Sequence, residues 1–468
     1  MDLSCFLKPA SVAVIGATER PGSWGSFIMS GLLSWGYTGR IHPVNPKGGS
    51  VYGLQAYRNV RDIPDPVELA ILTIPAEHVE ASIHDCGEKR VKGVTIITAG
   101  YAEAETDGHR REETLKRLAR RYDMHLLGPN VSGTMNLHAG FNAAASPARH
   151  LHPTPLAAVC QGGYAFYDIL ALGFPRGMGV GQFIHTGNEC DLNVTDFLEY
   201  FGTDPEVKAI LMYLETIREG RRFLEVASRV SRTKPVVVYK AGRTEGGARA
   251  AASHTGALAG RKALFEGVLA QAGLIVAPSM ETLLPLGHAL LEHPPMTGKR
   301  VGIATMGGSW GVVLSDAVEE AGLCVPELSA PLQSSLRALG MPSRASTRNP
   351  VDIGASGLYL DVKAMVAIGE IMLASGEVDA LVLHGLGRPG MLGPDTGDGA
   401  RIFMEIEKQV IDGYHQLERR YGRPVMIGNP FSIWESQVVA DLNRNGIRTV
   451  GRIDDIAQVL RVLSQAGT

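Results

Sequence analysis

A loop around His254 has the composition of a site for phosphoryl transfer. The stretch from Tyr239 to Gly260 reads YKAGRTEGGARAAASHTGALAG, in which glycine, alanine and small polar residues surround one histidine. These residues offer no rigid apolar face, so they indicate a loop that moves or approaches phosphate closely. Histidine suits phosphoryl carriage because one neutral ring nitrogen attacks while the other donates a hydrogen bond. Taken alone, a loop histidine is more often an ordinary exposed residue.

A carboxylate is needed to orient such an imidazole, and Glu215 is the candidate. It directly follows the apolar run Ala209–Leu214. Parallel α/β sheets place functional side chains at the carboxyl ends of their strands. We therefore expect Glu215 to fix the tautomer of His254 and to stabilise the phosphorylated ring. Without that context Glu215 reads as a surface acid.

A glycine-bearing turn near the N-terminus predicts a phosphate-containing ligand. GATERPGSWGS, from Gly16 to Ser26, follows an apolar strand and exposes backbone N–H groups at a helix start. The spacing is not GxGxxG, and the next strand ends in PVNPK with no acid for the ribose of NAD. Coenzyme A therefore fits better than NAD, with Lys47 as a point charge for phosphate. A tight turn with a solvated lysine is the equally ranked alternative.

Alternating strand and helix patterns would position these residues. Apolar runs predict five strands before residue 145, and three helical patterns lie between them. The strands are Ser11–Ile15, Ile41–Val44, Leu69–Ile74, Gly93–Ile97 and His125–Leu127, and the helices are Ser26–Trp35, Ala76–Glu88 and Glu113–Arg121. This alternation is typical of right-handed crossovers onto a parallel sheet.

Two further α/β series follow a Pro- and His-bearing linker at Ala145 to Pro155. Their predicted strands are Leu156–Val159, Gly179–Phe183, Ala209–Leu214, Pro235–Tyr239 and Leu274–Val276, then Arg300–Thr305, Ala380–Leu383 and Val425–Ile427. The predicted fold class is α/β, with three tandem Rossmann- or flavodoxin-like domains and mostly parallel sheets. We predict domains at residues 1–145, 155–293 and 299–468, since a chain of 468 residues is too long for one core.

Composition favours small-molecule ligands in a cytoplasmic protein. The net charge is −3 without long runs of one sign, which argues against nucleic acid and membrane partners. The five cysteines are scattered and lack zinc-binding spacing, so reduced thiols and no metal site are expected. The N-terminus lacks the blocks of a signal peptide, and no apolar run is long enough for a membrane helix.

Several motifs together resemble one enzyme family. VAVIGATERPGSWG, GYTGRIHPVNPKG and VYGLQAYRNVRDIP, followed by ILTIP, IITAGYAE and LGPNVSG, are similar to the CoA-binding domain of ADP-forming acyl-CoA synthetases. SHTGALAG, after KAGRT, resembles that family's phosphohistidine motif, and TGNECD resembles its GNE-D segment. The family is related to the alpha subunit of succinyl-CoA synthetase.

The resemblance implies a set of site residues. His254 and Glu215 would be catalytic, with no metal ligand in this chain. The implied CoA contacts are Gly16, Thr18, Gly22, Ser23, Gly25, Val44, Asn45, Pro46, Lys47, Ile74, Pro75, Thr98, Ala99, Gly100, Glu103 and Asn130. The implied phosphate contacts are Gly162, Gly163, Gly187 and Asn188. The alternative interpretation of TGNECD is a helix cap in which Asp191 accepts first-turn N–H groups, and the two interpretations are compatible.

One segment departs from the family pattern. At CQGGYAF the family usually has Gln-Ser-Gly, so Gly162 replaces a serine and Tyr164 replaces a small residue. Backbone donors and the helix dipole survive this change, but one hydroxyl donor is lost. The departure is compatible with an altered acyl substrate or with reduced catalytic competence.

The third domain resembles the family's third lobe through VGIATMGGSWG and RNPVD, and we assign it chiefly to assembly. Its glycines 307, 308 and 311 suit either an anion or a plain turn, and His415 and Glu418 read as a solvated helix face. The chain lacks a GxxxxGK[ST] loop and any ATP-grasp pattern. The resemblance thus implies an ATP-grasp beta subunit that holds ATP or ADP with Mg²⁺, usually in a heterotetramer.

The implied reaction converts acid, ATP and CoA reversibly into acyl-CoA, ADP and phosphate through an acyl phosphate and a phosphohistidine. Three alternatives remain open. A nicotinamide oxidoreductase is disfavoured by the missing acid after the second strand. A non-catalytic regulator would bind CoA or acyl-CoA without taking up phosphate, and a related acyl or carbamoyl transferase would act without nucleotide. The acid substrate is not identified by the sequence.

Overall fold

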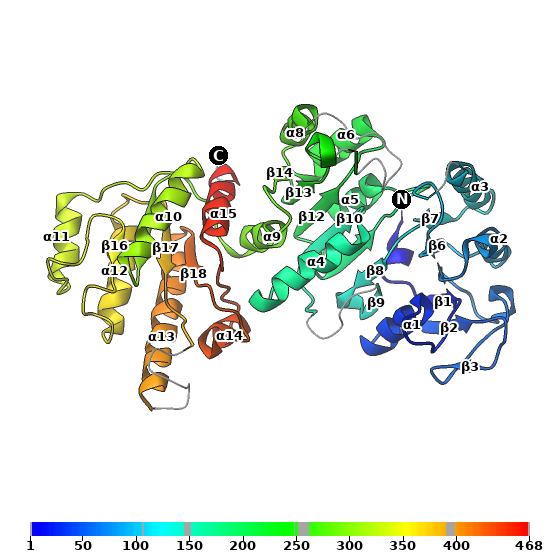
Figure 1. Cartoon of the computed structure of the whole chain (residues 1–468), viewed down its shortest axis with the longest axis horizontal. Helices are drawn as coiled ribbons and strands as arrows, with labels where there is room; N and C mark the ends of the chain where they lie inside the picture. Colours follow the sequence, from blue (N-terminus) through cyan, green and yellow to red (C-terminus); the bar gives the residue numbers. More distant parts are fainter. Residues whose placement is uncertain are drawn as a thin grey trace. The chain divides into compact units, whose positions relative to one another are not determined.

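The structure is a computed structural model that describes residues 2–104, 107–144, 151–247, 249–250, 262–389 and 398–466. Its contacts divide the chain into two units (Figure 1). Unit 1 comprises Met1–Ala171 and Gly179–Leu283, and unit 2 comprises Leu172–Met178 and Leu284–Thr468.

The first sheet of unit 1 is fully parallel, in the order β2-β1-β5-β6-β7. Its strands are β1 (Ser11–Ile15), β2 (Arg40–Val44), β5 (Leu69–Leu72), β6 (Gly93–Ile96) and β7 (His125–Leu127). The associated helices are α1 (Trp24–Ser34), α2 (Val79–Glu88) and α3 (Gly108–Arg121), with a small hairpin of β3 (Ser50–Val51) and β4 (Leu54–Gln55). Strands β1, β5 and β6 are buried along their whole length, as expected for a sheet covered on both faces.

The second sheet of unit 1 has the order β14-β13-β12-β10-β11-β8-β9. Its parallel strands are β10 (Leu156–Cys160), β11 (Gln182–His185), β12 (Ala209–Leu214), β13 (Val236–Lys240) and β14 (Ile275–Val276). The antiparallel strands β8 (Gly133–Asn136) and β9 (Phe141–Ala144) extend it beyond β11. Its helices are α4 (Gly163–Gly173), α5 (Val194–Thr203), α6 (Gly220–Val230) and α8 (Lys262–Gln271).

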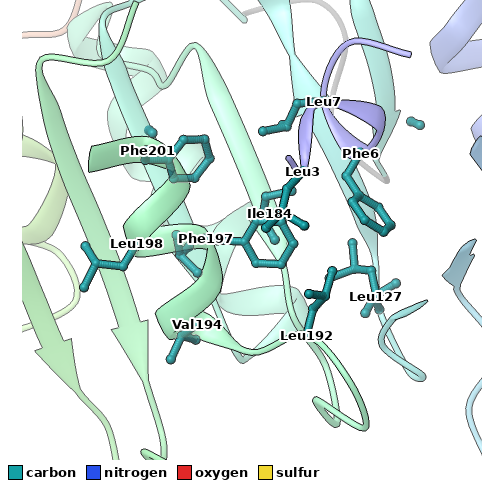
Figure 2. Packing of buried hydrophobic residues seen from close by; sticks show 14 of the residues in the cluster. Leu3, Phe6, Leu7, Leu127, Ile184, Leu192, Val194, Phe197, Leu198 and Phe201 are labelled. Atoms are coloured by element: carbon teal, nitrogen blue, oxygen red, sulfur yellow. The ribbon is translucent and has the colours of Figure 1, made fainter. Parts of the chain in front are cut away.

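A shared apolar core joins the two sheets of unit 1. The N-terminal turn η1 (Ser4–Phe6) places Phe6 against Phe197 of α5, with the ring centroids 6.2 Å apart and nearly perpendicular. Figure 2 shows Leu3 and Leu7 beside Ile184 of β11 and the α5 residues. The parallel strands of both sheets therefore belong to one packed body.

Unit 2 contains a four-stranded parallel sheet in the order β16-β15-β17-β18. Its strands are β15 (Val301–Thr305), β16 (Val351–Asp352), β17 (Ala380–His384) and β18 (Val425–Gly428). Its helices are α9 (Leu283–Glu292), α10 (Gly308–Glu320), α11 (Ala330–Ala338), α12 (Val362–Ala374), α13 (Asp398–Tyr421), α14 (Gln437–Arg444) and α15 (Ile453–Ala466). The short turn η6 (Phe174–Arg176) also belongs to this unit.

The predicted fold class is confirmed, but two local predictions are wrong. Helix α5 is capped by Asn193, whose side chain accepts the Thr195 N–H, while Asp191 instead accepts the N–H of Leu126 at 2.9 Å. Glu418 is only 4% exposed, because its carboxylate accepts hydrogen bonds from His293 and from the Val425 N–H. The Asp191 and Glu418 carboxylates each accept a backbone N–H from a strand, Leu126 in β7 and Val425 in β18.

The remaining differences concern boundaries. The strand predicted at Gly179–Phe183 runs instead from Gln182 to His185. Strands β8 and β9 precede the predicted domain boundary at residue 145, yet they pair with the second sheet. The division at 1–145, 155–293 and 299–468 stays a prediction. No helix in the described ranges is both long and apolar enough to cross a bilayer.

Candidate active site

A cavity of about 620 Å³ lies where strand ends of the two sheets of unit 1 meet. It is lined by Trp24, Thr73, Ile74, Ile97, Thr98, Ala99, Asn130, Val131, Ser132, Gln161, Gly162, Gly163, Ala165, Tyr167, His185, Gly187, Asn188, Tyr213 and Glu215. Most of these residues directly follow β5, β6, β7, β10, β11 or β12, and the carboxyl ends of parallel strands are where α/β proteins bind ligands. Four of the predicted CoA contacts, Ile74, Thr98, Ala99 and Asn130, line this cavity, and so do all four predicted phosphate contacts.

The turn before α1 brings that helix close to the sheet. Gly16 has φ +96°, and a Cβ atom there would lie 2.7 Å from the Thr73 hydroxyl oxygen. A Cβ atom at Gly25 would lie only 2.2 Å from the Gly16 carbonyl oxygen. Ser23 caps α1 by accepting the N–H of Ser26 at 3.3 Å. Two glycines thus let the helix start beside the turn, where Trp24 lines the cavity.

Other predicted CoA contacts lie around this turn rather than in the cavity lining. The Val44 carbonyl accepts the Gly16 N–H at 2.9 Å, and the Asn45 amide donates to the Ala17 carbonyl at 3.0 Å. Asn45 also accepts the Lys47 N–H at 3.0 Å. The remaining predicted residues here are Thr18, which is half-buried, and Gly22, Pro46, Lys47 and Pro75, which are exposed. Asn45 therefore connects the loop after β1, through Ala17, with the loop after β2, through Lys47.

Glu103 links the predicted CoA side of the cavity to the predicted phosphate side. Its carboxylate accepts the Gly100 N–H and the Asn188 amide, each at 2.5 Å. Burial acts to raise the pKa of Glu103, but hydrogen bonds from Asn188, Gly100 and Tyr101 outweigh burial, so the pKa lies below its usual value. The Asn188 amide also donates to Glu112 at 2.7 Å. Glu103 thus positions the Gly100 loop and Asn188 instead of lining the cavity.

Glu215 is nearly buried, with 6% of its surface exposed, and lies in the cavity lining directly after β12. Its backbone N–H donates to the Gln161 side-chain oxygen at 2.6 Å, and the Thr216 N–H donates to the same oxygen at 2.9 Å. Lys240, at the end of the neighbouring strand β13, is also buried. Burial lowers the pKa of Lys240, and the nearby Glu215 carboxylate opposes that effect. A carboxylate and a cation therefore lie at the ends of two neighbouring strands.

The departure at Gly162 has a structural consequence. A Cβ atom on Gly162 would lie 2.9 Å from Tyr213 Cε1 and 3.2 Å from Glu215 Oε1. Both distances are shorter than ordinary contacts, so a side chain here would displace the Tyr213 ring or the carboxylate. Gly162 and Gly163 form the start of the α4 region, whose N-terminal dipole favours an anion. At the position where the family usually has serine, the absence of a side chain on Gly162 thus lets the Tyr213 ring approach closely.

His254 lies outside the described residues, so its placement relative to Glu215 stays a prediction. In the part of the chain that the structure describes, no group of three or more His, Cys, Asp or Glu residues is arranged to hold a metal ion.

Comparison with known proteins decides the family. The family model of the CoA binding domain matches residues 10–136, and that of the succinyl-CoA ligase like flavodoxin domain matches residues 153–290. The chain is 35% identical over 459 residues to the alpha subunit of the ADP-forming acetate–CoA ligase I of Pyrococcus furiosus, covering 96% of this chain and 94% of that subunit. The chain belongs to the ADP-forming acyl-CoA synthetases, as an alpha-type subunit.

Other members of this family show how its proteins vary. The ADP-forming 4-hydroxybutyrate–CoA ligase of Nitrosopumilus maritimus is 33% identical over 360 residues, which are 75% of this chain and 51% of that protein. The solved acetyl-coenzyme A synthetase 1 of Ca. Korarchaeum cryptofilum, in complex with phosphate and ADP, aligns with a TM-score of 0.83 and 32% identity. That alignment covers 99% of this chain and 96% of the solved chain.

Sequence reasoning missed several cavity residues of this alpha-type subunit. Tyr213 lies within an apolar strand, Trp24 begins a helix, and His185 ends a strand whose predicted position was too early. The available signal was their position next to strand ends and glycine turns. It was weak, because apolar and aromatic residues there read as core.

Proposed function

We propose that this chain is the acyl- and CoA-binding subunit of an ADP-forming acyl-CoA synthetase that uses His254 as the phosphoryl carrier and Glu215 as the orienting carboxylate. The main support is a single cavity whose lining includes Glu215, the glycine-rich start of α4 and loops of the CoA-binding domain. A neighbouring carboxylate and backbone N–H groups match what an imidazole and a phosphate require.

The reaction would begin with phosphate attacking the carbonyl carbon of an acyl-CoA thioester. The C–S bond breaks, the CoA thiolate leaves and takes a proton, and an acyl phosphate remains. A nitrogen of His254 then attacks phosphorus, the bond to the acyl oxygen breaks, and the carboxylate leaves. Finally the phosphoryl group passes to ADP. Acceleration would come mainly from positioning and charge stabilisation.

Nucleotide and Mg²⁺ would be held by an ATP-grasp beta subunit, as alpha-type relatives imply. The ligands of this chain would then be CoA, phosphate and a small organic acid, within a heterotetramer. Four of the five cysteines are buried free thiols, which supports the cytoplasmic location that we propose.

Labelled phosphate tests the proposal directly. The chain is mixed with the ATP-grasp subunit and ATP labelled at the γ-phosphate, and the protein is assayed for an acid-labile, alkali-stable phosphate. We expect incorporation into the native chain, none into His254→Ala, and full incorporation into His109→Ala, which alters an exposed histidine on α3. Glu215→Gln is expected to slow incorporation about 10- to 100-fold.

The same assay separates the alternatives. Labelling that persists in His254→Ala contradicts the assignment of the carrier. CoA binding without any phosphate incorporation would favour the non-catalytic regulator. Turnover of a panel of acids by the native complex then identifies the substrate.

A further inference from the structure

His185, the last residue of β11, lies at the cavity with its side chain almost fully buried at 4% exposure. Its ring packs along the start of α4, since a Cβ atom on Gly163 would lie 2.9 Å from His185 Cε1. Both ring nitrogens have backbone partners from different segments. The Ser132 N–H lies 2.6 Å from Nδ1, and the Gln161 carbonyl oxygen lies 2.9 Å from Nε2.

These partners fix the state of the ring. A backbone N–H only donates, so Nδ1 must accept, and a carbonyl oxygen only accepts, so Nε2 must carry the hydrogen. His185 is therefore a neutral imidazole of one defined tautomer. Neither nitrogen can attack phosphorus without losing its hydrogen bond, which makes His185 unsuitable as a second phosphoryl acceptor in this arrangement.

The ring connects the two sides of the cavity. Ser132 is the last residue of the connection between β7 of the first sheet and β8 of the second sheet, and this connection also carries Asn130, a predicted CoA contact. Gln161 follows β10 in the second sheet, on the side of the predicted phosphate contacts. The Gln161 side-chain oxygen in turn accepts the N–H of Glu215 at 2.6 Å. His185 thus holds the backbone of Gln161, and the side chain of Gln161 holds the backbone of Glu215, so two sets of hydrogen bonds that share one residue link Ser132 to Glu215.

We propose that His185 is a positioning residue that sets the phosphoryl-transfer geometry of Glu215 through Gln161 and the ligand-binding geometry of the CoA side through Ser132. The effect of His185 on phosphoryl transfer through Glu215 rests on the proposed function. The effect of His185 on CoA binding depends only on its contact with Ser132. Through these contacts His185 would couple the binding of CoA on one side of the cavity to the position of Glu215 on the other.

Two substitutions each preserve one of the two hydrogen bonds. The side-chain oxygen of His185→Asn reaches the region of Nδ1 and can accept from Ser132, whereas the side-chain amide of His185→Gln reaches the region of Nε2 and can donate to Gln161. His185→Phe keeps the ring volume and removes both bonds. His109→Asn serves as a matched control on an exposed helix face.

The complex of this chain with its ATP-grasp subunit is assayed for the rate of phosphate incorporation and for the KM of CoA, and the chain alone is titrated with CoA calorimetrically. We expect His185→Phe to lose about 10- to 100-fold in incorporation rate and to bind CoA more weakly. His185→Gln should recover the incorporation rate but not CoA binding. His185→Asn should recover CoA binding but not the rate.

Recovery of different properties by the two polar variants supports the proposal, because general destabilisation would impair both properties in every variant. The proposal is overturned if His185→Phe matches the native chain, or if all three variants are equally impaired. Should the native complex take up no phosphate, the proposed function fails. The calorimetric titrations then still decide whether His185 controls the CoA side through Ser132.

Discussion

Gly162 illustrates how a single missing side chain shapes the site. The Tyr213 ring and the Glu215 carboxylate both lie within 3.2 Å of the place where a Cβ atom would project. We expect Gly162→Ala to lower kcat/KM for the acid about tenfold and stability by roughly 1 kcal/mol, because the ring or the carboxylate must move. CoA affinity should be unchanged, since loops of the first sheet hold CoA in our proposal.

Steady-state kinetics with acids of increasing size measure this effect. Gly220→Ala is the matched control, because nothing lies within 4 Å of its added methyl group. Native-like kinetics of Gly162→Ala with every acid would contradict a role for this contact.

Glu189 provides a pH prediction at the residue scale. Burial raises the pKa of its carboxyl to about 7 from an ordinary 4.5, although hydrogen bonds from Gln161, Thr186 and Val194 and the charge of Arg218 oppose the rise. Between these two pH values the folded chain keeps a proton that the unfolded chain has lost, so this group makes stability fall as pH rises from 4.5 to 7.

Glu189→Gln removes that titration. Relative to the native chain, the variant should gain on the order of 2 to 3 kcal/mol of unfolding free energy between pH 4.5 and pH 8. Urea unfolding at both pH values tests this, with the exposed Glu225→Gln as control. An equal difference between variant and native chain at both pH values would show that Glu189 does not titrate in this range.

At the scale of elements, the start of α1 depends on its approach to the turn after β1. A methyl group at Gly25 would lie 2.2 Å from the Gly16 carbonyl oxygen, which cannot be accommodated without moving the helix. We expect Gly25→Ala to weaken CoA binding at least about tenfold, because Trp24 and the turn move together. Calorimetric titration measures this, and Ser34→Ala in the exposed last turn of α1 is the control. Unchanged CoA affinity would remove this turn from the proposed site.

Apolar runs predicted most strands correctly because buried parallel strands are continuously apolar, as β1, β5 and β12 show. Strands β8 and β9 escaped prediction, since each has four residues and includes an asparagine that interrupts any apolar run. Strand β11 was predicted too early because its ends are Gln182 and His185, whose burial depends on hydrogen bonds to other segments.

In the candidate site, too, residues next to recognisable strands were predictable, whereas residues whose role depends on distant contacts were not. Glu215 was predictable, because it directly follows a recognisable strand and the position of a strand end is a local property. The role of His185 depends on Ser132 and Gln161, which come from two separate segments of the chain, before β8 and after β10. The buried state of Glu418 likewise depends on His293, 125 residues earlier in the chain. Such contacts are set by how elements pack, and the local pattern of residues carries no record of them.

At the scale of the whole molecule, the chain enters unit 2 twice. The short segment Leu172–Met178, which begins with the last two residues of α4 and precedes β11, belongs to that unit by its contacts. Within it, Arg176 donates to the carbonyl oxygens of Asn429 at 2.9 Å, Pro430 at 2.8 Å and Phe431 at 2.5 Å. The Arg176 carbonyl in turn accepts the Asn443 amide at 2.9 Å. A guanidinium from the middle of the sequence thus satisfies carbonyls of the loop after β18.

Removal of this guanidinium should therefore loosen unit 2 while leaving the cavity of unit 1 intact. We expect Arg176→Ala to cost about 3 kcal/mol locally, because three carbonyls, two of them in partly buried hydrogen bonds, lose a charged donor. Arg176→Lys should lie between alanine and the native chain, because one ammonium cannot reach all three. Hydrogen exchange should accelerate in peptides covering residues 425–431, with CoA affinity unchanged. The exposed Arg221→Ala is the control. Unchanged exchange in those peptides would mean that the loop after β18 holds its conformation without the segment inserted from the middle of the chain.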